Sequence, residues 1–328
     1  MVDFSMLWKG FKPLKFALYN QSECFFDGAY IEKTDQFLAN TSIKFNGEYI
    51  AIWNVLEEID EVILTSKMIH EMFHAFQQMN EDARFPNELE ALKEYSYTAE
   101  NLSIKLEENK LLAKLIERFD PIEYEHLLQL RSFRLSHYEY EYRYEAAIEQ
   151  IEGSANYVEL CTLKQISEEA FQKNLSSMLV QIQDPNKLIP IRIISYSIGA
   201  LLFYAQKQNN LVDFEYFSNI PTTISILENH PSYYGIHNIH PKIQKIVSTY
   251  QKDTKQIIET AINQGDCVAE GEFELLGVNV YNARYQDNYI VSTYFVMYGV
   301  EGKQNILYGN FVIKLNERGK VTRIIKIK

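Results

Sequence analysis

The chain has 328 residues, of which 46% are apolar and 23% charged, and these values are ordinary for a folded globular protein of about two domains. Its formal net charge of −12 argues against a nucleic-acid-binding surface and disfavours contact with an anionic membrane, because both partners require a clustered excess of Lys and Arg. Because the three cysteines (Cys24, Cys161 and Cys267) are widely spaced, and no leader segment or uncharged apolar stretch of about 18 residues is found, we expect a cytoplasmic protein without disulfides, a thiolate zinc cluster or a membrane span.

The first part of the chain, residues 14 to 53, is predicted to be β. Its clearest feature is a hairpin formed by residues 41 to 45 and 48 to 53 around the pair Asn46-Gly47. Asn-Gly is the preferred pair for a type I′ turn, in which both central residues take positive φ. An exposed edge of this hairpin could hold an extended peptide by strand addition, and an ordinary hairpin packed on a helix fits the sequence equally well.

The next segment, residues 54 to about 80, is predicted to be a helix with Asn54 as its N-cap, and it contains His70-Glu71-Met72-Phe73-His74. Residues four apart lie on one face of a helix, so His70 and His74 can present two imidazole nitrogens to one metal ion. The flanking side chains are apolar, which indicates a buried helix. A metal ion satisfies two buried imidazoles at once; two core histidines bonded to backbone are the alternative.

Helical periodicity returns over residues 87 to 118 and, after a turn at Asp120-Pro121, continues to residue 135. Further helices are predicted over residues 167 to 183, 190 to 208 and 241 to 263, and Gly265 closes the last of them. Residues 137 to 144 alternate like a strand, but strong helix formers follow without a break, so we predict a helix there too. Period-two segments then cover residues 271 to 281, 289 to 300, 305 to 315 and 321 to 327.

These elements predict an α+β fold in two domains. Residues 1–265 would form the larger domain, β-rich over 1–53 and helical over 54–265. Residues 266–328 would form a small antiparallel β domain, a meander with turns at Glu301-Gly302 and Arg318-Gly319.

A catalytic zinc has three protein ligands and one open position, so a third ligand is needed. Gln77 and Asn80 stand where an extended motif would have Gly and His, which leaves a Glu from a second helix. Glu94 and Glu152 compete for that role. Glycine inside a helix costs about 1 kcal/mol relative to alanine, so Gly153 indicates that two helices approach closely around an ion, and we favour Glu152.

An alternative interpretation of this helix is a solvated, charged face. It would carry the acidic side chains Glu145, Glu149, Glu152 and Glu159.

Two motifs resemble a known family. The string Glu152-Gly153-Ser154-Ala155-Asn156-Tyr157-Val158-Glu159 resembles the zinc-ligand helix of the aminopeptidase N type of zinc metallopeptidase, a gluzincin, in which a Glu followed by Gly is the third ligand. The string Ser195-Tyr196-Ser197-Ile198-Gly199-Ala200 is similar to that family's Tyr-x-x-Gly-Ala helix, whose tyrosine donates to the oxyanion. The resemblance covers only the catalytic core. It implies a zincin-like domain, a Zn²⁺ cofactor and a peptide or protein substrate.

The sequence also departs from that family. The Gly-x-Met-Glu-Asn segment that recognises a free amino group is absent, and the insertion between His74 and Glu152 is longer. Aminopeptidase specificity is therefore not carried over, and a divergent gluzincin peptidase is the expected class.

The resulting hypothesis is a zinc-dependent peptidase in which His70, His74 and Glu152 bind Zn²⁺ and Glu71 is the general base for a zinc-activated water. By the resemblance, Tyr196 would stabilise the oxyanion. The rival donors are Tyr234, His237 and His240, and Glu159 would be solvated or, less favoured, would orient a ligand histidine. The alternative is a non-catalytic metal-binding or protein-interaction protein that keeps the scaffold.

Overall fold

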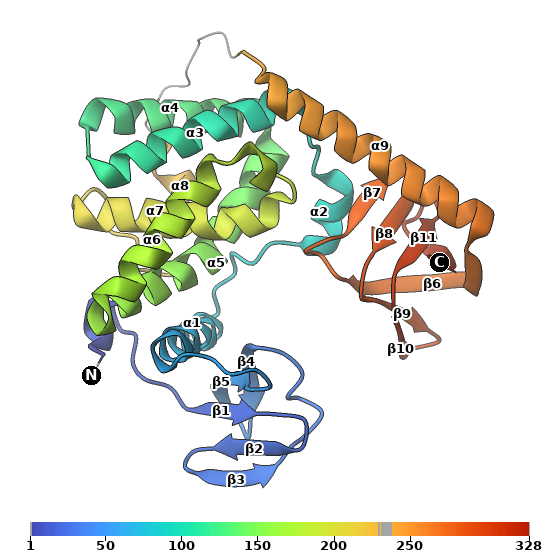
Figure 1. Ribbon diagram of the computed structural model, residues 1–328, viewed down its shortest axis with the longest axis horizontal. Coiled ribbons are helices and arrows are strands. Elements are labelled where there is room, and N and C mark those ends of the chain that lie inside the picture. Colours follow the sequence, from blue (N-terminus) through green and yellow to red (C-terminus); the bar gives the residue numbers. More distant parts are fainter. Residues whose placement is uncertain (1, 229, 231–237, 328) are drawn as a thin grey trace. The chain divides into compact units, whose positions relative to one another are not determined.

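The computed structural model describes residues 2–228, 230 and 238–327 (Figure 1). It contains a five-stranded mixed sheet, a helical region and a seven-stranded antiparallel sheet, in that order, so the predicted α+β class is confirmed. The chain divides into two compact units: Met1–Phe85, Leu106–Lys187 and Ile191–Tyr234 form the first, and Pro86–Lys105, Leu188–Pro190 and Gly235–Lys328 form the second. The domain boundary expected at residue 265 stays a prediction.

The N-terminal sheet of the first unit follows a short 3-10 turn, η1 (Phe4–Met6). Its strands lie in the order β3-β2-β1-β5-β4, and only β1 and β5 are parallel. Their bounds are β1 (Phe16–Tyr19), β2 (Glu23–Phe26), β3 (Ala29–Glu32), β4 (Thr41–Phe45) and β5 (Glu48–Asn54). The predicted hairpin is confirmed as β4 and β5, with φ of 49° at Asn46 and 85° at Gly47. In this strand order β4 lies at an edge of the sheet.

Helix α1 (Glu61–Met79) begins later than predicted. Its N-cap is Asp60, whose carboxylate accepts from the backbone N–H groups of Val62 and Ile63, whereas Asn54 ends β5. A carboxylate that satisfies two free N–H groups is a strong helix start, and its charge suits the positive end of the helix dipole. Helix α1 contacts β4, β5 and helix α5. It therefore connects the sheet to the helical region.

The helices of the described residues are α2 (Glu88–Glu94), α3 (Ala99–Glu117), α4 (Pro121–His137), α5 (Glu139–Ile166), α6 (Glu168–Gln183), α7 (Ile191–Gln208), α8 (Thr222–Ser225) and α9 (Pro241–Gln264), besides α1 and the 3-10 turn η2 (Pro185–Lys187). The single helix expected over 87 to 118 is divided by a non-helical segment at residues 95–98. The alternating segment is helical as predicted, with Tyr138 alone between α4 and α5. None of these helices has the length and hydropathy needed to cross a lipid bilayer.

The centre of the first unit is α5, which contacts α1, α4, α6, α7 and α8. Gly153 marks a close approach of α5 and α7, as its position in the helix suggested. A Cβ atom on Gly153 would lie 2.6 Å from the Cα of Gly199, and one on Gly199 would lie 2.5 Å from the carbonyl oxygen of Glu149. The two backbones thus pack without side chains between them, and this contact holds Glu152 against α7.

We expect Gly153→Ala to lower the free energy of unfolding by about 1–3 kcal/mol, because the added methyl must push two backbones apart. This cost exceeds the gain of up to about 1 kcal/mol from better helix propensity. Urea unfolding of the full chain measures it. Gly299→Ala is the matched control, since its added Cβ would meet only side-chain atoms, the nearest 3.4 Å away. A stabilised Gly153→Ala variant would contradict the tight contact.

In the second unit the sheet order is β10-β9-β6-β12-β11-β8-β7, and every neighbouring pair is antiparallel. The bounds are β6 (Asp266–Val278), β7 (Arg284–Gln286), β8 (Tyr289–Ser292), β9 (Phe295–Val300), β10 (Lys303–Tyr308), β11 (Phe311–Leu315) and β12 (Val321–Lys326). Since β6 lies between β9 and β12, the sheet is not the simple meander that the pattern indicated.

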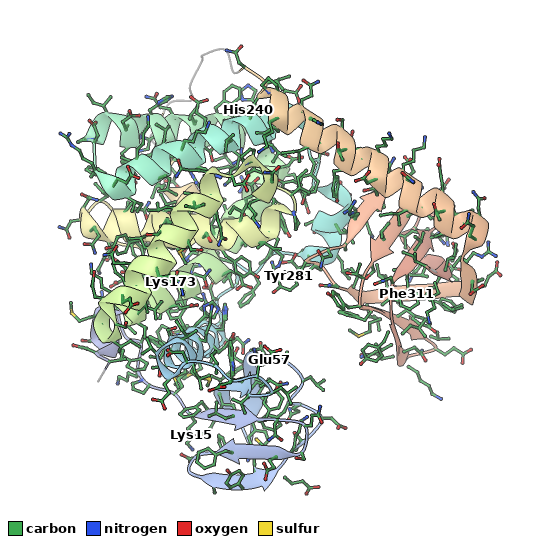
Figure 2. All side chains as sticks on the ribbon, viewed as in Figure 1. Lys15, Glu57, Lys173, His240, Tyr281 and Phe311 are labelled. Atoms are coloured by element: carbon green, nitrogen blue, oxygen red, sulfur yellow. The ribbon has the colours of Figure 1, made fainter. Side chains whose placement is uncertain are left out.

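Two strands that were predicted as continuous are each divided in this sheet. Tyr294 (φ 70°) separates β8 from β9, and Gly309 (φ 134°) separates β10 from β11. Positive φ breaks an extended strand. Phe311, labelled in Figure 2, follows the second break and is buried in the apolar core of this unit.

Candidate metal centre

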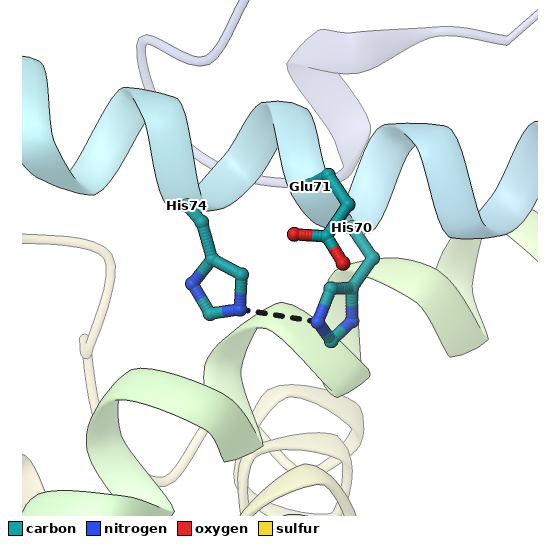
Figure 3. Close-up of side chains that lie close together, drawn as sticks. All are labelled: His70, Glu71 and His74. Atoms are coloured by element: carbon teal, nitrogen blue, oxygen red, sulfur yellow. Dashed lines mark hydrogen bonds between the residues drawn. The ribbon is translucent and has the colours of Figure 1, made fainter. Parts of the chain in front are cut away.

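Three side chains of α1, those of His70, Glu71 and His74, form the one group of the described residues that could hold a metal ion. Their potential ligand atoms all lie within 4.8 Å of one another. The Nε2 atoms of His70 and His74 are 3.1 Å apart, and Figure 3 shows Glu71 on the side of the helix that carries both rings. His70 and Glu71 are each 8% exposed, so the group is largely shielded from solvent.

Glu152 of α5 also reaches this group. Its Oε2 lies 3.4 Å from Nε2 of His74, and its Oε1 lies 3.1 Å from Nη2 of Arg192 on α7. Zinc bonds of 2.0–2.1 Å in a tetrahedron place neighbouring ligand atoms about 3.3 Å apart. The distances from His74 to His70 and to Glu152 are close to that value. Two imidazole nitrogens and a carboxylate oxygen are a donor set that zinc accepts in proteins.

The charges at this contact are set by the side chains around it. Burial would raise the pKa of Glu152, but the hydrogen bond and charge of His74, followed by the charge of Arg192, lower this pKa to about 2. Burial likewise lowers the pKa of His74, and Glu152 outweighs this effect and raises the pKa above its usual value. The acid is therefore ionised and attracts a positive charge, which a proton on His74 or a bound cation can supply.

Glu159, also on α5, lies behind His70. Its Oε2 is 3.2 Å from Nδ1 of His70, and its Oε1 is 2.8 Å from Nζ of Lys67. Burial would raise the pKa of Glu159, but His70 and then Lys67 lower it. The favoured expectation of a solvated Glu159 is wrong, because the side chain is 2% exposed and its charge is compensated by α1. Glu159 is therefore a buried acidic neighbour of His70, and a role in orienting its ring stays a prediction.

Gln77 occupies the corresponding place behind His74. Its Oε1 lies 2.8 Å from Nδ1 of His74, and its Nε2 donates to the carbonyl oxygen of Ile151 and to the hydroxyl of Ser154. Gln77, Lys67 and Arg192 were not found from the sequence. Gln77 and Lys67 share a helix face with the histidines, being three residues from His74 and His70, and this spacing could have indicated them. No sequence signal indicated Arg192.

Tyr196 is half-buried on α7, one turn after Arg192. Its ring centroid lies 5.4 Å from the guanidinium carbon of Arg192, which contacts Glu152. Its role in stabilising an oxyanion stays a prediction.

The remaining candidates lie elsewhere in the chain. Glu94, the last residue of α2, is exposed and belongs to the second unit. His240, labelled in Figure 2, precedes α9 in the same unit. Its backbone N–H donates to the hydroxyl of Ser103. Tyr234 and His237 are outside the described residues. Of the two acids considered for the third ligand, Glu152 lies in the same unit as the histidines and contacts His74.

In comparisons of this chain with protein-family models, with curated proteins and with solved structures, no match is found.

Proposed function

We propose that this protein is a zinc-dependent peptidase whose metal is held by His70, His74 and Glu152. The observation that carries the proposal is the distance of 3.1 Å between two histidine Nε2 atoms, with the Glu152 carboxylate 3.4 Å from one of them and Glu71 beside both rings. Two imidazoles, one distant carboxylate and an adjacent acid that need not coordinate form the set that metal-assisted hydrolysis requires.

The chain's own residues divide the chemistry between them. A zinc ion, when bound, supplies a Lewis acid that polarises a carbonyl and lowers the pKa of water. Glu71 takes a proton from the attacking water and gives it to the leaving amine, which is general base and then general acid catalysis. Tyr196 donates a hydrogen bond to the oxygen on which negative charge develops.

A peptide substrate is supported by the free edge of the N-terminal sheet. Strand β4 pairs only with β5 among the described strands, so its outer backbone groups are available to an added strand. Helix α1 contacts both β4 and β5. An extended peptide paired with β4 would therefore lie along the sheet on which the metal-binding helix packs.

Zinc content and its removal test the proposal. We expect the purified full chain to bind about one Zn²⁺, and a chelator to remove the metal together with hydrolysis of casein or of a peptide library; added zinc should restore both. At a zinc concentration 100 times its Kd, the metal should stabilise the folded chain by about 2.7 kcal/mol.

A matched pair of variants completes this test. His74→Ala should lose the metal, whereas His137→Ala, an exposed histidine on α4, should keep it. A chain that binds no zinc at neutral pH would refute the proposal. Stoichiometric zinc without hydrolysis of any library peptide would instead assign the chain to the alternative, a metal-binding protein that is not a peptidase.

A further inference from the structure

We propose that Gln77 is a positioning residue that holds the proton of His74 on Nδ1 and thereby presents the Nε2 lone pair to the metal. This inference rests on the zinc site of the proposed function, but it requires no peptidase activity. Gln77 is 1% exposed and lies at the contact between α1 and α5.

The orientation of the Gln77 amide follows from its partners on α5. Its Nε2 lies 3.0 Å from the carbonyl oxygen of Ile151, and a carbonyl oxygen only accepts hydrogen bonds. The atom facing Ile151 is therefore the nitrogen of the amide. A flipped amide would place two oxygens against each other in a buried position.

Ser154 fixes the same orientation independently. Its hydroxyl donates to the carbonyl oxygen of Gln150, one turn earlier in α5, so its own oxygen is left as an acceptor. Nε2 of Gln77 lies 3.0 Å from that oxygen. Both hydrogens of the amide nitrogen are thus used, one on Ile151 and one on Ser154.

The orientation of the Gln77 amide determines which ring nitrogen of His74 carries the hydrogen. The Gln77 oxygen, turned away from α5, lies 2.8 Å from Nδ1 of His74 and can only accept, so Nδ1 carries a hydrogen. When the ring is otherwise neutral, Nε2 then has a free lone pair. That lone pair points to the place where Nε2 of His70 lies 3.1 Å away and Oε2 of Glu152 lies 3.4 Å away.

Zinc affinity of the full chain, measured by competition with a chromogenic chelator, tests this role. We expect Gln77→Met, which is similar in size but has no acceptor oxygen, to weaken zinc binding by about 10–100-fold. Gln77→Glu keeps an acceptor for Nδ1 and should bind zinc more tightly than Gln77→Met. The control is Gln78→Met on the same helix, which should match the wild type.

Two results would overturn the proposal: wild-type affinity in Gln77→Met, or Gln77→Glu no better than Gln77→Met. If neither variant folds, nitrogen NMR of the zinc-loaded wild type decides, since His74 should show a protonated Nδ1 and a metal-bound Nε2, and metal on Nδ1 would refute the assignment. These readouts do not depend on turnover. If all Gln77 variants bind zinc as the wild type does, only the role of Gln77 is refuted. If the wild type binds zinc but hydrolyses no peptide, only the proposed peptidase activity is refuted.

Discussion

Glu71→Gln should bind zinc as the wild type does and hydrolyse peptides about 10²–10⁴ times more slowly. The amide has nearly the volume of the carboxylate, so the packing around α1 should not change at this largely buried position. It cannot take a proton from water, however, and the base is lost while the proposed ligands His70, His74 and Glu152 remain. The measurement is kcat on the best peptide from a library digest, together with metal content by elemental analysis.

The matched control is Glu61→Gln, an exposed glutamate in the first turn of the same helix, which should leave both zinc content and kcat unchanged. Two results for Glu71→Gln would contradict the assignment, each in a different way. Turnover near the wild-type rate in Glu71→Gln would remove Glu71 from the role of base. Loss of zinc in that variant would show that Glu71 is a ligand, as its place in the three-residue group allows.

The parts of this site that the sequence predicted are those set by local geometry. A helix brings residues four apart to one face, so the pairing of His70 and His74 required only that the segment be helical. The Asn46-Gly47 turn is equally local, because two positive φ angles specify the hairpin. Gly153 predicted a close helix contact, because a glycine that weakens its own helix indicates a neighbour that leaves no room for a side chain. The identity of that neighbour, α7, is seen only in the structure.

The parts that the sequence did not predict depend on residues far apart in the chain. The alternative of a solvated, acidic α5 is wrong: Glu145, Glu149 and Glu159 are buried. Their partners, Arg134, Arg131 and Lys67, lie on α4 and α1. A buried carboxylate and an exposed one look identical in a sequence, and only the arrangement of helices distinguishes them. The same limit applies to Arg192, which meets Glu152 across 40 positions of sequence.

The buried ion pair of Arg131 and Glu149 should make a large contribution to the stability of the fold. Arg131 donates through Nη2 to Glu149 and through Nε to the hydroxyl of Tyr142, 2.9 Å away, and the side chains of Arg131 and Glu149 are 1% and 0% exposed. We expect Arg131→Met to lower the free energy of unfolding of the unit that holds α4 and α5 by about 3–5 kcal/mol, because the buried charge of Glu149 loses this guanidinium. Urea unfolding of the full chain measures the loss. Arg118→Met, at an exposed arginine just after α3, should change it by less than about 0.5 kcal/mol.

The double variant Arg131→Met/Glu149→Leu distinguishes the cost of an uncompensated Glu149 charge from the cost of lost packing around Arg131. Two charges taken out of water are compensated by their attraction only in part, so replacing both with apolar side chains of similar size is often neutral. We therefore expect the double variant to be much more stable than Arg131→Met alone. If it is as unstable as the single variant, the loss comes from packing around Tyr142 and not from an uncompensated carboxylate. If it recovers, the pair is replaceable for stability. Zinc affinity of the recovered variant would then show whether the pair matters to Glu152, one turn further along α5.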